Sequence, residues 1–68
     1  MKEESKNIYK VNTLVNEDGE LQYYQIQTLL FGKWHTVRVF NVSDSTEIAR
    51  YKLYVSMLEE MGDEIIYE

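Results

Sequence analysis

The hydrophobic pattern of this chain changes its period once, near residue 43, and this change restricts the possible folds more than any other feature. Before it, apolar and polar residues alternate with a period of two, which is typical of β-strands. After it, apolar residues recur with a period of about 3.6, which is typical of an amphipathic helix. The sequence therefore predicts an α+β fold in which strands are followed by one helix.

Three segments rich in β-branched and aromatic residues are predicted to be strands, at residues 8–15, 21–31 and 34–42. Asp18-Gly19 lies between the first two and suits the left-handed geometry of a tight hairpin. Gly32-Lys33 is predicted to make the second turn. Because both connections are short, the three strands are expected to form an antiparallel meander.

The helix is predicted to begin after Asp44, a good N-cap residue with Glu47 three positions later, and to end at Gly62. The expected architecture is β-β-β-α, with the helix packed on one face of a three-stranded sheet. Residues 8–62 are predicted to form this single domain. Residues 1–7 are expected to be a disordered N-terminus, and residues 63–68 an acidic C-terminal tail.

Large apolar residues are predicted on both faces of the sheet, although one helix covers only one face. In the third strand, Trp34, Phe40 and Val42 are expected to share one face, opposite Val37 and Val39. Uncovered apolar surface of this extent is typical of an interface, and a chain of 68 residues gains stability from self-association. We therefore expect a homodimer. Its predicted interface consists of three helix residues: Tyr51, Tyr54 and Leu58.

The net charge of −5 lies entirely in the last third of the chain. Residues 44–68 contain seven acids and two bases, whereas the acids and bases of residues 1–43 cancel. This distribution repels nucleic acid, whose binding depends on cationic residues, and attracts a basic protein surface. We therefore expect a protein partner, with no direct contact to nucleic acid.

The residues that support catalysis or metal binding are scarce. The chain has no cysteine, and His35 is its only histidine, so neither a thiolate nor a multi-histidine metal site is expected. None of the serines lies in a sequence motif typical of a catalytic nucleophile paired with a base. No apolar run approaches the roughly 18–20 residues that cross a bilayer. The sequence predicts a non-enzymatic, cytoplasmic protein without cofactor, metal or membrane contact.

The segment from about Tyr9 to Leu58 resembles the small acidic uracil-DNA glycosylase inhibitors of podoviruses that infect Bacillus. The resemblance consists of a Tyr-x-Val-x-Thr-Leu strand, an acidic hairpin ending in Asp18-Gly19, the doublet Tyr23-Tyr24, and Asp44-x-x-Glu47-Ile48 at the helix start. Gln25 stands where the family has an acid after the doublet. The carboxylates are therefore expected from Asp44, Glu47 and the acids at 59–64.

The resemblance implies a homodimer of a three-stranded sheet with one helix, acting in the cytoplasm of the host bacterium. Such a protein mimics DNA, occupies the DNA-binding groove of the host uracil-DNA glycosylase, and captures a protruding apolar side chain of the enzyme in a hydrophobic pocket. The pocket, which the dimer of such a protein offers, is expected to be lined by Tyr24, Trp34, Phe40 and valines of the strands. The protein-binding residues expected on this basis are Tyr23, Tyr24, Gln25, Trp34, Val37, Val39, Phe40, Asp44 and Glu47.

Three other functions fit the same features. One is another phage or mobile-element anti-defence protein, such as an anti-CRISPR or anti-restriction protein, that blocks a different nucleic-acid enzyme. Another is a small dimerisation module whose aromatic residues serve only its own core. The last is a β-β-β-α DNA-binding domain, which needs a basic sheet, whereas Lys33 and Arg38 are the only cations of the second and third predicted strands and the turn between them.

Overall fold

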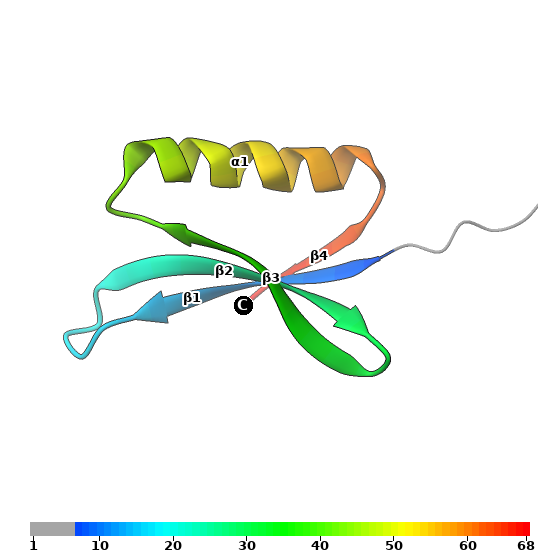
Figure 1. Ribbon diagram of the computed structural model, residues 1–68, viewed down its shortest axis with the longest axis horizontal. Coiled ribbons are helices and arrows are strands. Elements are labelled where there is room, and N and C mark those ends of the chain that lie inside the picture. Colours follow the sequence, from blue (N-terminus) through cyan, green and yellow to red (C-terminus); the bar gives the residue numbers. More distant parts are fainter. Residues whose placement is uncertain (1–6) are drawn as a thin grey trace, which may run out of the picture.

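The computed structural model describes residues 7–68, which form one helix lying across one face of a four-stranded sheet (Figure 1). The elements in chain order are β1 (Ile8–Val15), β2 (Leu21–Leu30), β3 (Lys33–Asn41), α1 (Ser45–Glu60) and β4 (Glu64–Tyr67). The strand order in the sheet is β3-β2-β1-β4. Strands β1, β2 and β3 form the predicted antiparallel meander, and β4 pairs with β1 in parallel.

The fourth strand corrects the sequence prediction, because residues 63–68 are not a separate tail. Gly62 has a φ of 82° and its N–H donates to Glu59, so the chain reverses direction directly after the helix. Ile65 then lies opposite Tyr9 and packs against the core. The helix supplies the long crossover that a parallel strand pair requires.

The predicted disordered start, residues 1–7, lies outside the described residues except for Asn7. The carbonyl of Asn7 accepts a hydrogen bond from the Glu64 N–H at 3.1 Å. Its own N–H donates to a carboxylate oxygen of Asp63 at 3.3 Å. Asn7 therefore belongs to the β1–β4 contact.

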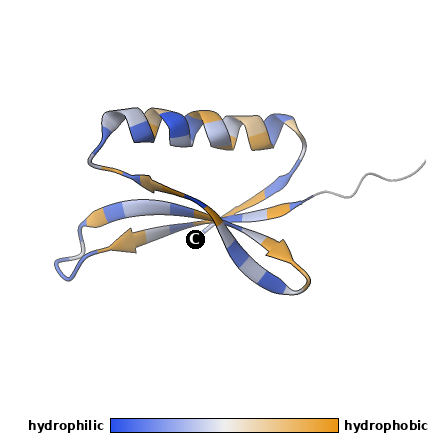
Figure 2. Cartoon of the chain, in the orientation of Figure 1, coloured by the Kyte–Doolittle hydropathy of each residue, from blue (hydrophilic) through white to orange (hydrophobic). Residues whose placement is uncertain are grey.

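The core lies between α1 and the sheet face that it covers. Its centre is Ile26 of β2, whose exposed fraction is 0%. Figure 2 shows apolar and polar residues alternating along the strands, as expected when only one face of a sheet is buried. The buried core residues are Val11, Ile26, Phe40 and Val55, with Tyr9, Tyr24, Tyr51, Tyr54 and Ile65 packed against them.

A β-bulge in β3 changes which side chains share a face. Ile26 lies opposite Arg38 and Gln27 lies opposite Thr36, so Val37 is an extra residue in β3. The extra residue reverses the alternation on one side of the bulge. Trp34, which was predicted to share a face with Phe40, therefore lies on the face away from the helix.

The turn between β2 and β3 is formed by Phe31 and Gly32, one residue earlier than predicted. Both have positive φ angles, 51° and 77°, as in the two-residue hairpins that match the twist of a sheet. Glycine adopts this geometry freely, but for other L-residues the left-handed conformation costs about 1–2 kcal/mol. The side chain of Phe31 is also fully exposed.

The buried centre of the core predicts a difference between two apolar truncations. Ile26→Ala removes a fully buried side chain and is expected to lower the free energy of unfolding by about 3 kcal/mol. Leu53→Ala removes a side chain that is 70% exposed and is expected to change it by less than about 0.5 kcal/mol. Urea denaturation measures both variants, and equal losses would contradict the position of the core.

Candidate functional site

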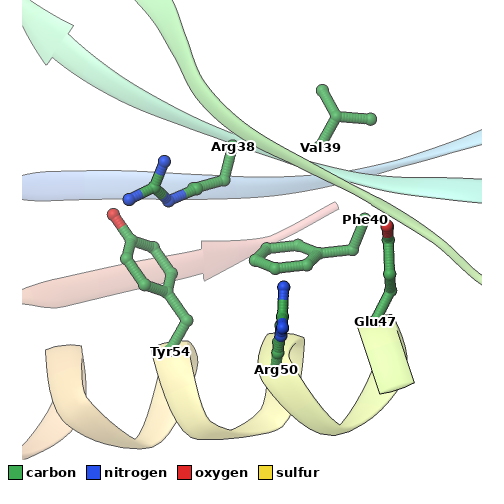
Figure 3. Close-up of a pocket in the computed structure, with 6 residues that line it drawn as sticks. All are labelled: Arg38, Val39, Phe40, Glu47, Arg50 and Tyr54. Carbon is green, nitrogen blue, oxygen red and sulfur yellow. The ribbon is translucent and has the colours of Figure 1, made fainter. Parts of the chain in front are cut away.

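A pocket with a volume of about 330 Å³ opens between β3 and α1 (Figure 3). We call it the β3–α1 pocket. The rings of Phe40 and Tyr54 lie between the strand and the helix, and the Arg38 guanidinium lies 5.6 Å from the centre of the Tyr54 ring. The residues that line it are Arg38, Val39, Phe40, Glu47, Arg50 and Tyr54.

The connection between β3 and α1 holds this pocket in place. Asp44 caps the helix, because its carboxylate accepts the Thr46 N–H at 2.9 Å. Glu47 accepts the Asn41 N–H at 2.7 Å and so ties the first helical turn to the end of β3. The two predicted acids therefore both stabilise the helix start, and Glu47 also lines the pocket.

The rim of the β3–α1 pocket carries two cations that sequence reasoning missed. Arg38 and Arg50 are exposed and line the pocket, while Glu47 is its one acidic lining residue. Arg38 lies two residues before Phe40 in regular register, so the alternation of β3 places it on the helix side. Arg50 could have been identified from its helical spacing, since it lies one turn before Tyr54. The pocket thus combines an aromatic floor with a largely basic rim.

The three predicted dimer residues pack against the chain's own sheet. Tyr51 stacks on Tyr24, with ring centres 4.2 Å apart and an angle of 6° between the rings. Phe40 contacts Tyr51 edge-on at 5.8 Å and lies 6.2 Å from Tyr54. Leu58 is only 3% exposed, so it has almost no surface left for a partner. The homodimer itself stays a prediction.

The face of the sheet away from the helix holds other predicted site residues. Gln25 and Gln27 accept hydrogen bonds from Asn12, and the Lys10 ammonium lies 4.3 Å from the centre of the Trp34 ring. The structure therefore separates the predicted binding residues into two groups. Tyr24, Phe40 and Glu47 lie on the helix side, whereas Tyr23, Gln25, Trp34 and Val39 lie on the opposite face, with Val37 at the bulge.

Five carboxylates lie on the end of α1, the following turn and the β4 edge of the sheet. We call this group the acidic edge: Glu59, Glu60, Asp63, Glu64 and Glu68. Residues 53–68 contain no lysine or arginine. The N–H groups of Glu64 and Glu68 donate to backbone carbonyls of Asn7 and Val11 at 3.1 and 3.0 Å. Hydrogen bonds to this part of the chain therefore hold Glu64 and Glu68 in place, although the sequence predicted that both belong to a tail.

Residues 7–68 provide no group of three or more potential ligands that could hold a metal ion. Within the same residues, no helix has the length and apolar character needed to cross a membrane. Comparison with protein families, curated proteins and solved structures gave no match to this chain. The geometry thus defines an aromatic pocket and an acidic edge.

Tyrosines with raised pKa values predict a loss of stability at alkaline pH. Burial raises the pKa of Tyr51 above its usual value of 10.0, and the nearby Tyr67 and Tyr24 raise it further. Burial likewise raises the pKa values of Tyr9 and Tyr67. The folded state therefore favours the neutral phenols. The contribution of these tyrosines to the free energy of unfolding is therefore present below pH 10. It is lost as the pH rises above 10, because tyrosines of the unfolded chain ionise at a lower pH than those of the folded chain.

Thermal melts between pH 8 and pH 12 are expected to show this loss, at and above the ordinary tyrosine pKa of about 10. Tyr51→Phe keeps the ring stacked on Tyr24 but removes the ionisable hydroxyl, so its midpoint should fall less steeply with pH than that of the native chain. Parallel curves for both proteins would show that Tyr51 makes no such contribution.

Proposed function

We propose that this chain inhibits uracil-DNA glycosylase by mimicking DNA, so that its carboxylates occupy the cationic groove in which the enzyme holds the phosphate backbone. The observation that carries the proposal is the acidic edge, where α1 and β4 hold Glu59, Glu60 and Glu64, and a backbone hydrogen bond to Val11 holds Glu68. The target is suggested by the sequence resemblance described above. The proposed inhibitor acts in the cytoplasm of a bacterial host.

Fixed carboxylates suit a mimic better than a flexible acidic tail does. A partner that binds a tail must also order it, and this entropic cost lowers the affinity. Here β4 is already ordered by its hydrogen bonds to β1. A row of like charges also speeds the encounter with an oppositely charged groove, and this effect weakens as salt is added.

The β3–α1 pocket supplies a second contact in this proposal. Its floor contains the aromatic rings of Phe40 and Tyr54, which suit an apolar side chain of the target. Burying such a side chain contributes about 25 cal/mol per Å² and slows release of the target. Arg38 and Arg50 at its rim are positively charged, so they do not mimic phosphate groups. The acidic edge therefore accounts for attraction to the groove, and the pocket for retention.

The proposal predicts that charge at the acidic edge matters more than charge elsewhere. The test is uracil excision from duplex DNA by a purified bacterial uracil-DNA glycosylase, with the inhibitor titrated at several salt concentrations. The triple variant Glu59→Gln, Glu60→Gln, Glu64→Gln should weaken inhibition at low salt by at least about tenfold. The difference from the native chain should shrink as salt rises.

The matched control changes the same number of charges at the β1–β2 hairpin: Glu17→Gln, Asp18→Asn, Glu20→Gln. These residues lie at the opposite end of β1 from its contact with Glu64. The control should inhibit almost as well as the native chain. Equal loss in both variants would indicate that only net charge matters, and unchanged excision with excess native protein would reject this target.

A further inference from the structure

Strand β4 forms one edge of the sheet, and its outer side pairs with no other strand of residues 7–68. The N–H groups of Glu64 and Glu68 point inward, because both donate to backbone carbonyls on the β1 side. The backbone groups of successive residues in a strand point to opposite sides. The N–H and C=O groups of Ile65 and Tyr67 therefore point outward, where they are available to another extended segment.

The side chains along this edge follow a regular pattern on the face away from the helix. Ile65 packs against the core on the helix side, so the alternation of the strand places Glu64, Ile66 and Glu68 on the opposite face. All three side chains are exposed. The edge thus presents two carboxylates with an apolar side chain between them.

The chain's own cations leave these two carboxylates unneutralised. Lys10 lies opposite Ile66 in the β1–β4 pair. Its ammonium group, however, lies 4.3 Å from the centre of the Trp34 ring in β3, across β2 from the β4 edge. Residues 53–68 contain no lysine or arginine. Negative charge is therefore available at this edge for a partner.

The charge of this edge determines which partner fits it. In an antiparallel pair of two copies of β4, Glu64 of each copy would lie near Glu68 of the other, and these like charges repel. A basic side chain opposite each of the two acids instead forms a favourable cross-strand pair, and an apolar side chain between them packs on Ile66. The fitting segment therefore has a basic, an apolar and a basic residue at alternate positions.

We propose that β4 binds an extended basic segment of a partner protein, which adds a fifth strand to the sheet. Main-chain hydrogen bonds to Ile65 and Tyr67 provide the pairing, and Glu64 and Glu68 provide selectivity for the basic segment. The proposal does not depend on the proposed function, because it requires only the free edge. If both hold, the bound segment and the groove of the enzyme compete for Glu64.

The probe is the labelled peptide Ser-Thr-Lys-Thr-Val-Thr-Lys-Thr-Ser, and fluorescence anisotropy measures its binding to the full chain. A second peptide has proline in place of the two threonines that flank valine. It keeps the charge but lacks the N–H groups for pairing, so it should bind at least about tenfold more weakly. No binding of the first peptide, or equal binding of both, overturns the proposal.

Amide hydrogen exchange, followed by NMR, tests where the peptide binds. In the free chain, the amides of Ile65 and Tyr67 point outward and should exchange fast. Saturating peptide should slow both by at least about tenfold, because they become part of a ladder. Unchanged exchange at both positions with the peptide bound would show that it binds elsewhere, and would overturn the proposal.

Two matched variants test the role of charge. The double variant Glu64→Lys, Glu68→Lys should bind the basic peptide at least about tenfold more weakly, and should prefer a peptide with glutamate in place of both lysines. The control Glu17→Lys, Glu20→Lys reverses two charges at the β1–β2 hairpin and should bind the basic peptide almost as the native chain does. Slow amide exchange at positions 64 and 68 shows that β4 is intact in each variant. Undiminished binding by the first variant, or equal loss in both, overturns the proposal.

Discussion

The contact between the aromatic side of α1 and the inner face of the sheet is the interaction on which the rest of this structure depends. Tyr51 lies flat on Tyr24, and Phe40 fills the space between Tyr51 and Tyr54. Aromatic side chains bury a large area each, which matters in a chain of 68 residues without disulfides. The rings of Phe40 and Tyr54 also form the floor of the β3–α1 pocket, so the core and the candidate binding site share these two residues.

The position of α1 also determines where the last strand lies. The helix crosses from the end of β3 to the opposite edge of the sheet, and the turn at Gly62 directs the chain alongside β1. Ile65 then enters the core while Glu64 and Glu68 remain exposed. A short strand of three consecutive apolar residues, with Glu64 before them and Glu68 after them, therefore completes the core and carries charge at both ends.

Much of this fold could be predicted from the sequence because its signals are local. The alternation in β1 and β2, the Asp18-Gly19 turn and the Asp44 cap each involve residues close together in the chain. Strand β4 could not be predicted in this way, since its partner β1 lies more than fifty residues earlier, as the hydrogen bond between Asn7 and Asp63 shows. Four residues are also too few to establish a period.

The candidate site was less predictable than the fold because of one residue, Val37, which forms the bulge in β3. The sequence around Val37 alternates regularly, and no local pattern indicates that a bulge occurs there. The bulge separates Trp34 from Phe40, whereas Arg38 lies two residues before Phe40 on the same side of the bulge and lines the pocket with it. An error of one residue in register exchanges the two faces of a strand. Trp34 and Phe40, expected together in one pocket, therefore lie on opposite faces of the sheet of a single chain, and Phe40 lines the β3–α1 pocket.

The central claim is that the chain's final residues are a strand of the sheet that fixes the acidic edge. Amide hydrogen exchange of Glu64 and Glu68, followed by NMR, tests it most directly. Their N–H groups donate to the carbonyls of Asn7 and Val11, so both amides should exchange far more slowly than those of an unstructured peptide. Exchange at the rate of a free peptide at both positions would show that these acids belong to a tail.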